Sequence, residues 1–257
     1  DGSGKEAHAI ELAALINCEC PSESGACGDC PSCKKIKSFQ HGNIKLILPY
    51  PRGKISSSED PSIRGLTEKN IDQLRGMMME KGRNPYARIE IENARTILIN
   101  SIREVKKGLY MSRIDKGWTV VLIFDAEKLC IPQPTAANAL LKVLEEPPDK
   151  TIFILVTSEV SVMMDTIRSR CQQIYFPPLV SSFIEQKLKQ HEVSNDKVKV
   201  ISNIANGNIR LALSLSENID ELFSDLKLMI KACYSPSPAS WQAVTNRTAV
   251  LKRKSVS

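Results

Sequence analysis

The chain has few of the features that attach a protein to a membrane or direct it out of the cell. Its 257 residues contain no uninterrupted run of about eighteen apolar residues, and no basic segment followed by an apolar one opens the sequence. It also lacks an internal repeat of the kind that builds solenoids. We therefore expect a cytoplasmic protein with no membrane partner.

Charge of either sign is not in large excess. The formal net charge is +6, a basic bias that is compatible with nucleic acid or an acidic partner but too small to require either. With 42% hydrophobic and 25% charged residues, the composition is that of a globular chain, in one large domain or two to three smaller ones. The first residue is Asp1 rather than Met, and Asp1 to Lys5 reads like the end of a phosphate loop, so we expect a fragment.

Cysteines are concentrated near the start of the chain. Five of the eight fall between positions 18 and 33, and the other three stand alone within apolar or regularly patterned segments. This spacing indicates a metal site rather than a disulfide framework, with free or disulfide-bonded cysteines as the alternative. Four thiolates suit a closed, structural zinc site, because no His, Asp or Glu stands at ligand spacing to serve an activated water. The candidate ligands are Cys18, Cys27, Cys30 and Cys33, and the spacing alone leaves Cys20 open as a replacement for Cys18.

Apolar patterning predicts a parallel α/β sheet followed by helices. Continuous runs of branched apolar residues predict buried strands at 119–124 and 152–156, and the segment between them predicts a crossover helix over 135–144. Earlier segments predict a helix over 6–16, a short strand over 43–48, an irregular excursion over 49–63 and helical spacing within 88–109. Later ones predict helices at 180–190, 196–205, 209–215 and 220–232, with a linker or turn at 234–238.

Two short stretches carry a resemblance to a known family. The run from Ala137 to Pro148, Ala-Asn-Ala-Leu-Leu-Lys-Val-Leu-Glu-Glu-Pro-Pro, is followed about twenty residues later by Ser169-Arg170-Cys171. Together they resemble the clamp-loader branch of the AAA+ ATPases, and the likeness extends over nearly the whole chain. It implies a P-loop-type α/β domain over 1–177 that lacks its first strand and carries a zinc module at 18–33. A three-helix lid over 178–217 and the beginning of a truncated helical collar over 218–257 would follow.

The resemblance also decides between the two candidate zinc ligands and locates a nucleotide site. The eight-residue spacing from Cys18 to Cys27 is the one that the family uses. The family's phosphate loop falls on Gly2, Gly4 and Lys5, its metal-binding strand end on Asp125, its sensor 1 position on Thr157 and its sensor 2 position, more weakly, on Arg210.

This nucleotide site departs from the working pattern in two places. A functional phosphate loop ends Gly-Lys-Ser/Thr, with the hydroxyl on Mg²⁺, whereas this chain has Glu6 after Lys5. The catalytic glutamate that follows the strand-end aspartate is replaced by Ala126, and Glu127 is one position late. Loss of such a base costs a factor of about 10² to 10⁴. We expect Mg·ATP binding to be weakened or lost and intrinsic hydrolysis to be very slow; Asp125 as a simple turn cap remains an alternative.

Arg170 is the residue that the resemblance implicates in catalysis. In this family the corresponding arginine lies at a subunit edge and contacts the γ-phosphate of a neighbour, an arginine finger supplied in trans. The alternative is an ordinary surface arginine, which is our expectation for Arg168. Arg210 serves either as a vestigial sensor 2 or at an interface between lid helices.

The leading hypothesis is a non-hydrolysing subunit of a replication clamp loader. Its partners would be the other loader subunits, the ATPase gamma/tau and delta, and through the complex the sliding clamp and primer-template DNA. One alternative is an active ATPase subunit of the gamma/tau type. Another is a stand-alone zinc nucleic-acid-binding protein, supported only by Lys34, Lys35 and Lys37 beside the cysteines.

Overall fold

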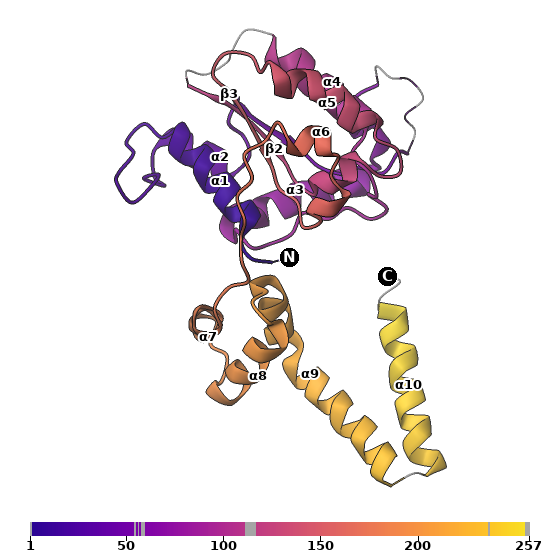
Figure 1. The fold of residues 1–257 in the computed structure, drawn as a ribbon. Helices are drawn as coiled ribbons and strands as arrows, with labels where there is room; N and C mark the ends of the chain where they lie inside the picture. The colour runs from indigo at the N-terminus through magenta and orange to yellow at the C-terminus, as the bar shows by residue number, and fades with distance from the viewer. Residues whose placement is uncertain are drawn as a thin grey trace. The chain divides into compact units, whose positions relative to one another are not determined.

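A computed structural model describes residues 2–53, 55, 57, 60–110, 117–235 and 237–254 (Figure 1). Asp1, at the predicted phosphate loop, Pro236, in the predicted linker, and the last three residues of the predicted collar lie outside the described residues. The chain divides into two compact units, Ser3–Pro177 and Pro178–Ser257, the second of which also includes Gly2. No helix within the described part is long and apolar enough to cross a membrane.

The first unit is built on a three-stranded parallel sheet in the order β1-β2-β3. These strands are β1 (Ile44–Ile47), β2 (Thr119–Ile123) and β3 (Thr151–Leu155). In the register of the sheet, Leu122 of the central strand lies opposite Leu46 on one side and Ile154 on the other. All five residues of β2 are buried. A strand that is buried on both faces needs a continuous run of branched apolar residues without polar alternation, and this segment has one. The three predicted strands are confirmed.

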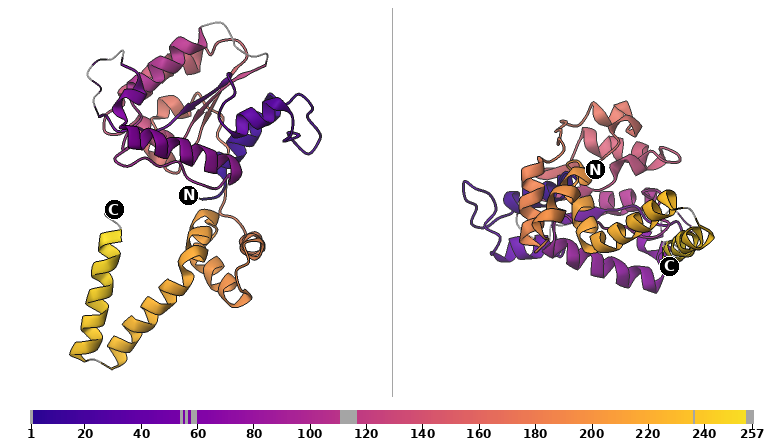
Figure 2. Two further views of the ribbon diagram at one scale, coloured as in Figure 1. Left: turned by 180° about the vertical axis from the view of Figure 1, so that it is seen from behind. Right: turned by 90° about the horizontal axis from the view of Figure 1, so that it is seen from below.

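Helices cover both faces of this sheet (Figures 1 and 2). They are α1 (Lys5–Ile16), α2 (Pro31–Lys37), α3 (Glu68–Arg83), α4 (Ile99–Leu109), α5 (Thr135–Glu145) and α6 (Asp165–Arg168), with 3₁₀ turns η1 (Ser62–Gly65), η2 (Ala126–Leu129) and η3 (Val160–Val162). Because side chains alternate along a strand, Val120 and Leu122 pack in the core beneath α1 and α3, and Val121 and Ile123 pack beneath α4 and α5.

Local sequence explains where several helices begin. Gly4 precedes α1 with φ 84°, a left-handed conformation in which glycine has no steric penalty. Thr67 caps α3 by accepting a hydrogen bond from the backbone N–H of Asn70. The predicted crossover helix is confirmed as α5, and Pro147 and Pro148 follow its C-cap residue, Glu146.

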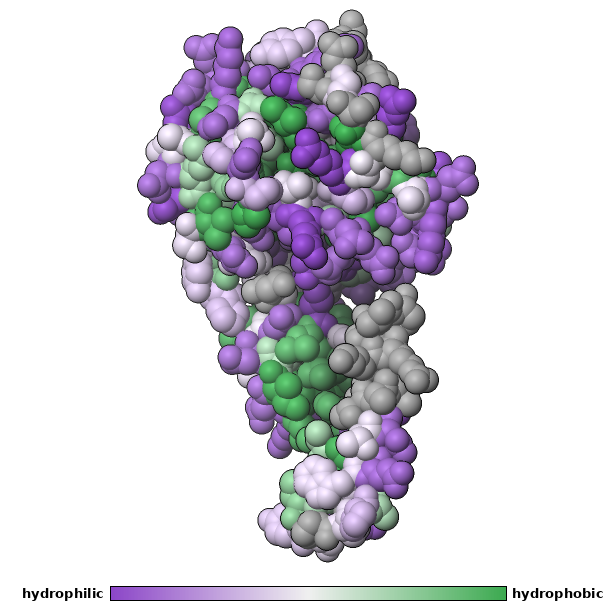
Figure 3. Space-filling model, turned by 90° about the vertical axis from the view of Figure 1, so that its right-hand side faces the viewer, coloured by the Kyte–Doolittle hydropathy of each residue, from purple (hydrophilic) through white to green (hydrophobic). Residues whose placement is uncertain are grey.

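The second unit consists of helices within the described residues. They are α7 (Ser181–Gln190), α8 (Asn195–Ala205), α9 (Ile209–Tyr234) and α10 (Pro238–Lys254). Ile184, Leu188 and Ile201 are fully buried in its core, and Arg247 of α10 forms ion pairs with Glu221 and Asp225 of α9. Figure 3 shows an apolar area on the surface of this unit; the exposed large apolar residues of α9 include Leu226, Met229, Ile230 and Tyr234.

The structure departs from the predicted elements in four places. Helical spacing was expected within 88–109, but α4 begins only at Ile99, because Thr96 pairs with Tyr50 and the backbone N–H of Ile97 donates to Lys128. The helices expected at 209–215 and 220–232 form the single helix α9, since no Gly or Pro separates them. Helices α2 and α3 were not predicted, whereas α10 lies within 218–257, where the beginning of a helical collar is expected.

Shortening the apolar side chain at the centre of the sheet should destabilise the first unit. Leu122 is fully buried, so we expect Leu122→Ala to lower the free energy of unfolding by about 2–5 kcal/mol. Leu12→Ala, at a position that is 42% exposed on α1, is the control and should change it by less than about 1 kcal/mol. The measurement is urea unfolding followed by the fluorescence of Trp118 in a Trp241→Phe background. Equal losses in the two variants would contradict the assignment of Leu122 to the core.

Candidate functional site

The four predicted zinc ligands come together in a compact cluster. The Sγ atoms of Cys18, Cys27, Cys30 and Cys33 all lie within 4.8 Å of one another, and those of Cys27 and Cys33 are 3.9 Å apart. A zinc–sulfur bond of about 2.3 Å in a tetrahedron separates sulfurs by about 3.8 Å. The residues present therefore fit a structural zinc ion. Cys20 is exposed and outside the cluster.

Local structure explains how the cluster forms and why the pKa values of its thiols differ. Cys30 caps α2, Pro31 occupies the first helical turn and Cys33 is buried within the helix. Backbone N–H groups point at the sulfurs; that of Cys33 lies 3.4 Å from Cys30 Sγ. This hydrogen bond is the main reason that the pKa of Cys30 falls to about 6. The backbone N–H of Cys27 likewise lowers the pKa of Cys18, whereas burial raises that of Cys33 to about 12.

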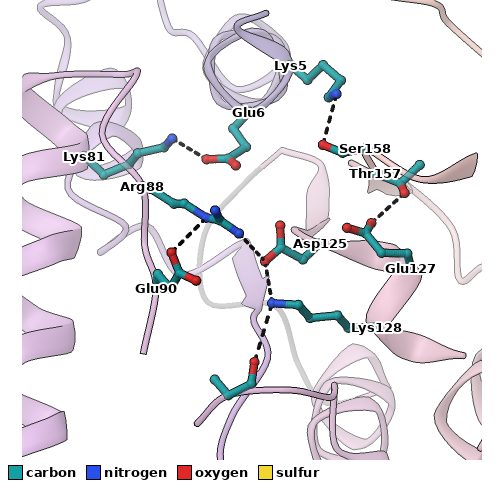
Figure 4. Close-up of polar contacts among 11 residues, drawn as sticks. Lys5, Glu6, Lys81, Arg88, Glu90, Asp125, Glu127, Lys128, Thr157 and Ser158 are labelled. Carbon is teal, nitrogen blue, oxygen red and sulfur yellow. Dashed lines mark hydrogen bonds and ion pairs between the residues drawn. The ribbon is translucent and has the colours of Figure 1, made fainter. Parts of the chain in front are cut away.

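A second polar site lies at the carboxyl ends of the strands, beside the amino end of α1 (Figure 4). Lys5 is the first residue of α1, and its Nζ donates to Ser158 Oγ at 3.3 Å. Ser158 stands next to Thr157 in the segment that follows β3. The start of α1 and the end of β3, which are distant in sequence, thus meet at one edge of the sheet, where ligands bind in open parallel α/β folds.

Glu6 forms an ion pair with a buried lysine. The Nζ of Lys81, from α3, contacts the carboxylate of Glu6, donates to the carbonyl of Ala87 at 2.6 Å and lies 5.8 Å from the centre of the Phe124 ring. The side chain of Lys81 is 0% exposed and that of Glu6 is 12% exposed. The carboxylate of Glu6, at the position where the resemblance leads us to expect a magnesium-binding hydroxyl, is therefore held by a cation from the same chain, as Figure 4 shows.

Asp125 is also surrounded by cations of this chain. Its carboxylate lies 3.0 Å from Lys128 Nζ and 3.7 Å from Arg88 Nη2, and Arg88 in turn faces Glu90 at 3.4 Å. The backbone of Asp125 is left-handed, with φ 50°, and its side chain makes no capping hydrogen bond to η2. Asp125 therefore stands at the N-cap position of η2 through its backbone, as the turn-cap alternative expects, and the charge of its side chain is balanced by ion pairs.

Thr157 and Glu127 form a third contact at this edge. The hydroxyl of Thr157 donates to the carboxylate of Glu127 at 2.5 Å, and Thr157 Oγ1 accepts from the backbone N–H of Glu159. Glu127 is 8% exposed. Glu127 is thus engaged with Thr157, the position expected to be sensor 1, and the neighbouring Ala126 is fully buried.

Arg170 lies at the other end of the segment that follows β3. Its Nε donates to Glu145 Oε1 at 2.8 Å, its Nη2 contacts the same oxygen, and its Nη1 donates to the carbonyl of Thr166 at 2.7 Å. Arg168 instead pairs with Asp165 at 2.8 Å, a contact across one turn on the surface that is of little energetic value.

The remaining predicted residues belong to the second unit. Arg210 lies in the first turn of α9. Gly2 is grouped with the same unit, where its carbonyl accepts a hydrogen bond from the backbone N–H of Ile209. The described structure of the first unit therefore assembles Gly4, Lys5, Asp125 and Thr157 around the strand ends, and it assembles the cysteine cluster separately.

Sequence reasoning missed the cations of this site. Lys81, Arg88, Lys128 and the acceptor Glu145 were not predicted to take part. The signal for Lys128 was present, since it stands three positions after Asp125 in one turn. Lys81 pairs with a residue 75 positions away, and no local pattern indicates that pairing.

Comparison with known proteins gives one matching family. Its description is "DNA polymerase III, delta subunit", and the match spans residues 1–180. The chain is 30% identical over 232 residues to DNA polymerase III subunit delta′ of Bacillus subtilis (strain 168), covering 90% of the chain and 55% of that protein. It is 26% identical over 244 residues to subunit delta′ of Escherichia coli (strain K12), covering 95% of the chain and 60% of that protein.

Matches extend to other subunits of the same enzyme. Subunit tau of Bacillus subtilis (strain 168) is 27% identical over 231 residues, covering 88% of the chain and 33% of that protein. A solved DNA polymerase III gamma-subunit-related protein from Thermotoga maritima is 21% identical with a TM-score of 0.39, covering 77% of the chain and 64% of that protein. The chain spans 55% and 60% of the length of the two delta′ relatives.

Removing one member of the Glu6–Lys81 pair should destabilise the fold more than removing both. A buried carboxylate that loses its cation costs about 3–5 kcal/mol, whereas replacing the whole pair by neutral groups is close to neutral. We expect Lys81→Met alone to show the larger loss and the double variant with Glu6→Gln to recover most of it. Urea unfolding of the four proteins in this cycle measures the coupling.

The matched control for this cycle is an exposed pair on the same helix. Arg75 and Asp72 are 3.5 Å apart with side chains about three-quarters exposed, so Arg75→Met and Asp72→Asn should couple by less than about 1 kcal/mol. A coupling between Glu6 and Lys81 no larger than this control would show that their ion pair is not buried in solution.

Proposed function

The chain belongs to the DNA polymerase III delta-subunit family, and from that premise we propose that it is a non-hydrolysing subunit of a clamp loader. In this proposal it helps to form the hetero-oligomeric ring that loads a sliding clamp on primer-template DNA during replication. Its partners are the gamma/tau ATPase and delta subunits, and it supplies Arg170 to the nucleotide of a neighbouring ATPase. The names of the delta′ and tau relatives support the subunit class.

The observation that carries the non-hydrolysing role is the set of ion pairs inside the chain's own nucleotide site. Glu6 is paired with Lys81, and Asp125 is paired with Lys128 and Arg88. Carboxylates that already have cations of the same chain as partners are not available to coordinate the metal of Mg·ATP, and a fully buried Ala126 offers no base to activate water. These features favour a non-hydrolysing subunit over an ATPase of the gamma/tau type.

The geometry of Arg170 supports its role as a trans arginine finger. A finger needs a guanidinium at the protein surface with donors directed outward, since it stabilises charge on a phosphate held by another subunit. The side chain of Arg170 is 33% exposed and is anchored by Glu145 and Thr166. An arginine with this partial exposure can reach a partner without first leaving the core.

The cysteine cluster is proposed to hold one structural Zn²⁺ through Cys18, Cys27, Cys30 and Cys33. Four sulfurs at tetrahedral spacing complete the coordination shell, so the ion would stabilise the module between α1 and α2 rather than activate water. Cys33 and Ile36 of α2 belong to the same core as Ala13 and Ala14 of α1. Zinc would therefore stabilise the packing of these two helices.

Zinc content should depend on the four clustered cysteines and not on Cys20. We expect one zinc per chain in the wild-type protein and in Cys20→Ser, and substantially less in Cys18→Ser and Cys30→Ser, since three thiolates hold zinc less tightly than four. Elemental analysis after exhaustive dialysis measures the content. Retention of zinc by Cys18→Ser together with its loss from Cys20→Ser would assign the fourth ligand to Cys20 instead.

Arg170 should govern ATP turnover by the neighbouring subunit. In a complex of the full-length protein with its cognate ATPase subunits, we expect Arg170→Ala to lower kcat at that neighbour's site by about 10³- to 10⁵-fold. Steady-state ATP hydrolysis with the other sites inactivated measures it. Arg168→Ala, two residues away, is the matched control and should leave turnover unchanged.

The same assay separates the proposal from an active ATPase subunit. The isolated full-length protein should show no ATP hydrolysis above background, because Glu6 and Ala126 replace the magnesium-binding hydroxyl and the base. Turnover by the isolated protein at the rate of its ATPase partners would overturn the non-hydrolysing role. Unchanged turnover in the Arg170→Ala complex would overturn the finger.

A further inference from the structure

The side chain of Arg170 is oriented by one carboxylate. Glu145 Oε1 accepts from both Nε, at 2.8 Å, and Nη2 of the guanidinium, while the carbonyl of Thr166 accepts from Nη1 at 2.7 Å. A planar guanidinium that is held at three of its nitrogens by two acceptors has one preferred orientation, because its donors are fixed in a rigid fork.

These contacts leave part of the fork for another acceptor. Arginine has five N–H donors, one on Nε and two on each terminal nitrogen. Within the described residues, the hydrogen bonds above use one donor from each nitrogen. One N–H on Nη1 and one on Nη2 remain, which is the pair of donors that can contact two phosphate oxygens at once.

Glu145 is well placed to act as a fixed support. It is the last residue of α5, and Ala137, Leu140 and Val143 of that helix are buried in the core beneath the sheet. The helix ends there, and Pro147 and Pro148 prevent its continuation. The carboxylate therefore extends from a rigid helix, whereas Arg170 follows the four-residue helix α6.

We propose that Glu145 is the positioning residue for Arg170, holding its guanidinium in the orientation in which two N–H groups meet a phosphate of the neighbouring subunit. This inference rests on the proposed trans arginine finger. Glu145 does not touch the nucleotide in this scheme; it acts through Arg170. The exposed ion pair contributes little to the stability of the fold. Its effect is to restrict the side chain of Arg170 beforehand, so that less conformational entropy is lost when the transition state forms.

The test measures ATP turnover in the assembled complex with variants at position 145. We expect Glu145→Ala to lower kcat by about ten- to a hundredfold without a matching change in KM, since misorientation of a catalytic group affects the transition state. Glu145→Gln should recover turnover to within about threefold of wild type, because an amide oxygen accepts the same two hydrogen bonds. Glu146→Ala, at the adjacent exposed glutamate, is the matched control and should not change kcat.

A variant pair distinguishes positioning from a general structural effect. In an Arg170→Ala background, Glu145→Ala should cause no further loss of kcat, because the side chain through which it acts is gone. A full additional loss in that background overturns the positioning role, as does a Glu145→Gln variant that is as slow as Glu145→Ala. The thermal unfolding midpoint of each variant should match that of its parent.

The outcomes also separate this inference from the function on which it rests. If Arg170→Ala lowers turnover and Glu145→Ala does not, the finger stands and the positioning role is wrong. If Arg170→Ala has no effect, the finger itself is wrong, and Glu145 loses its role with it.

Discussion

The complete burial of β2 is the constraint on which the rest of the first unit depends. A strand whose side chains are excluded from water on both faces needs a strand on each edge and helices above and below. Val120 and Leu122 fill one core and Val121 and Ile123 fill the other. Because the strands are parallel, their carboxyl ends meet at one edge, and Asp125 and Thr157 are carried there as a consequence of hydrophobic packing.

Charge at this edge is balanced within the chain. Helix α1 begins there, and its amino end favours an anion. In this chain Glu6 lies in its first turn with Lys81 as its partner, while Lys128 and Arg88 face Asp125. A site whose carboxylates already have cationic partners can remain folded without a metal or a nucleotide, because no buried charge is left unpaired.

The sequence predicted those parts of the molecule whose signals are local. Runs of branched apolar residues identified β2 and β3. The cysteine spacing indicated the metal cluster, and the family resemblance chose Cys18 over Cys20 as its fourth member. Helix α3 was not predicted, since Leu74 is the one apolar residue among its buried positions and Gly76 interrupts its pattern. The pairings of Glu6 with Lys81 and of Glu145 with Arg170 join residues 75 and 25 positions apart, and only the folded chain brings such residues together.

The strand-end site and Arg170 are connected through β3. That strand leads to Thr157 and Ser158, which bind Glu127 and Lys5, and then through η3 and α6 to Arg170. The hydrogen bonds of Thr157 and Ser158 therefore fix the end of β3, from which the segment that carries Arg170 starts. In the proposed role of Arg170, this fixed strand end is the rigid support that an arginine acting in trans requires.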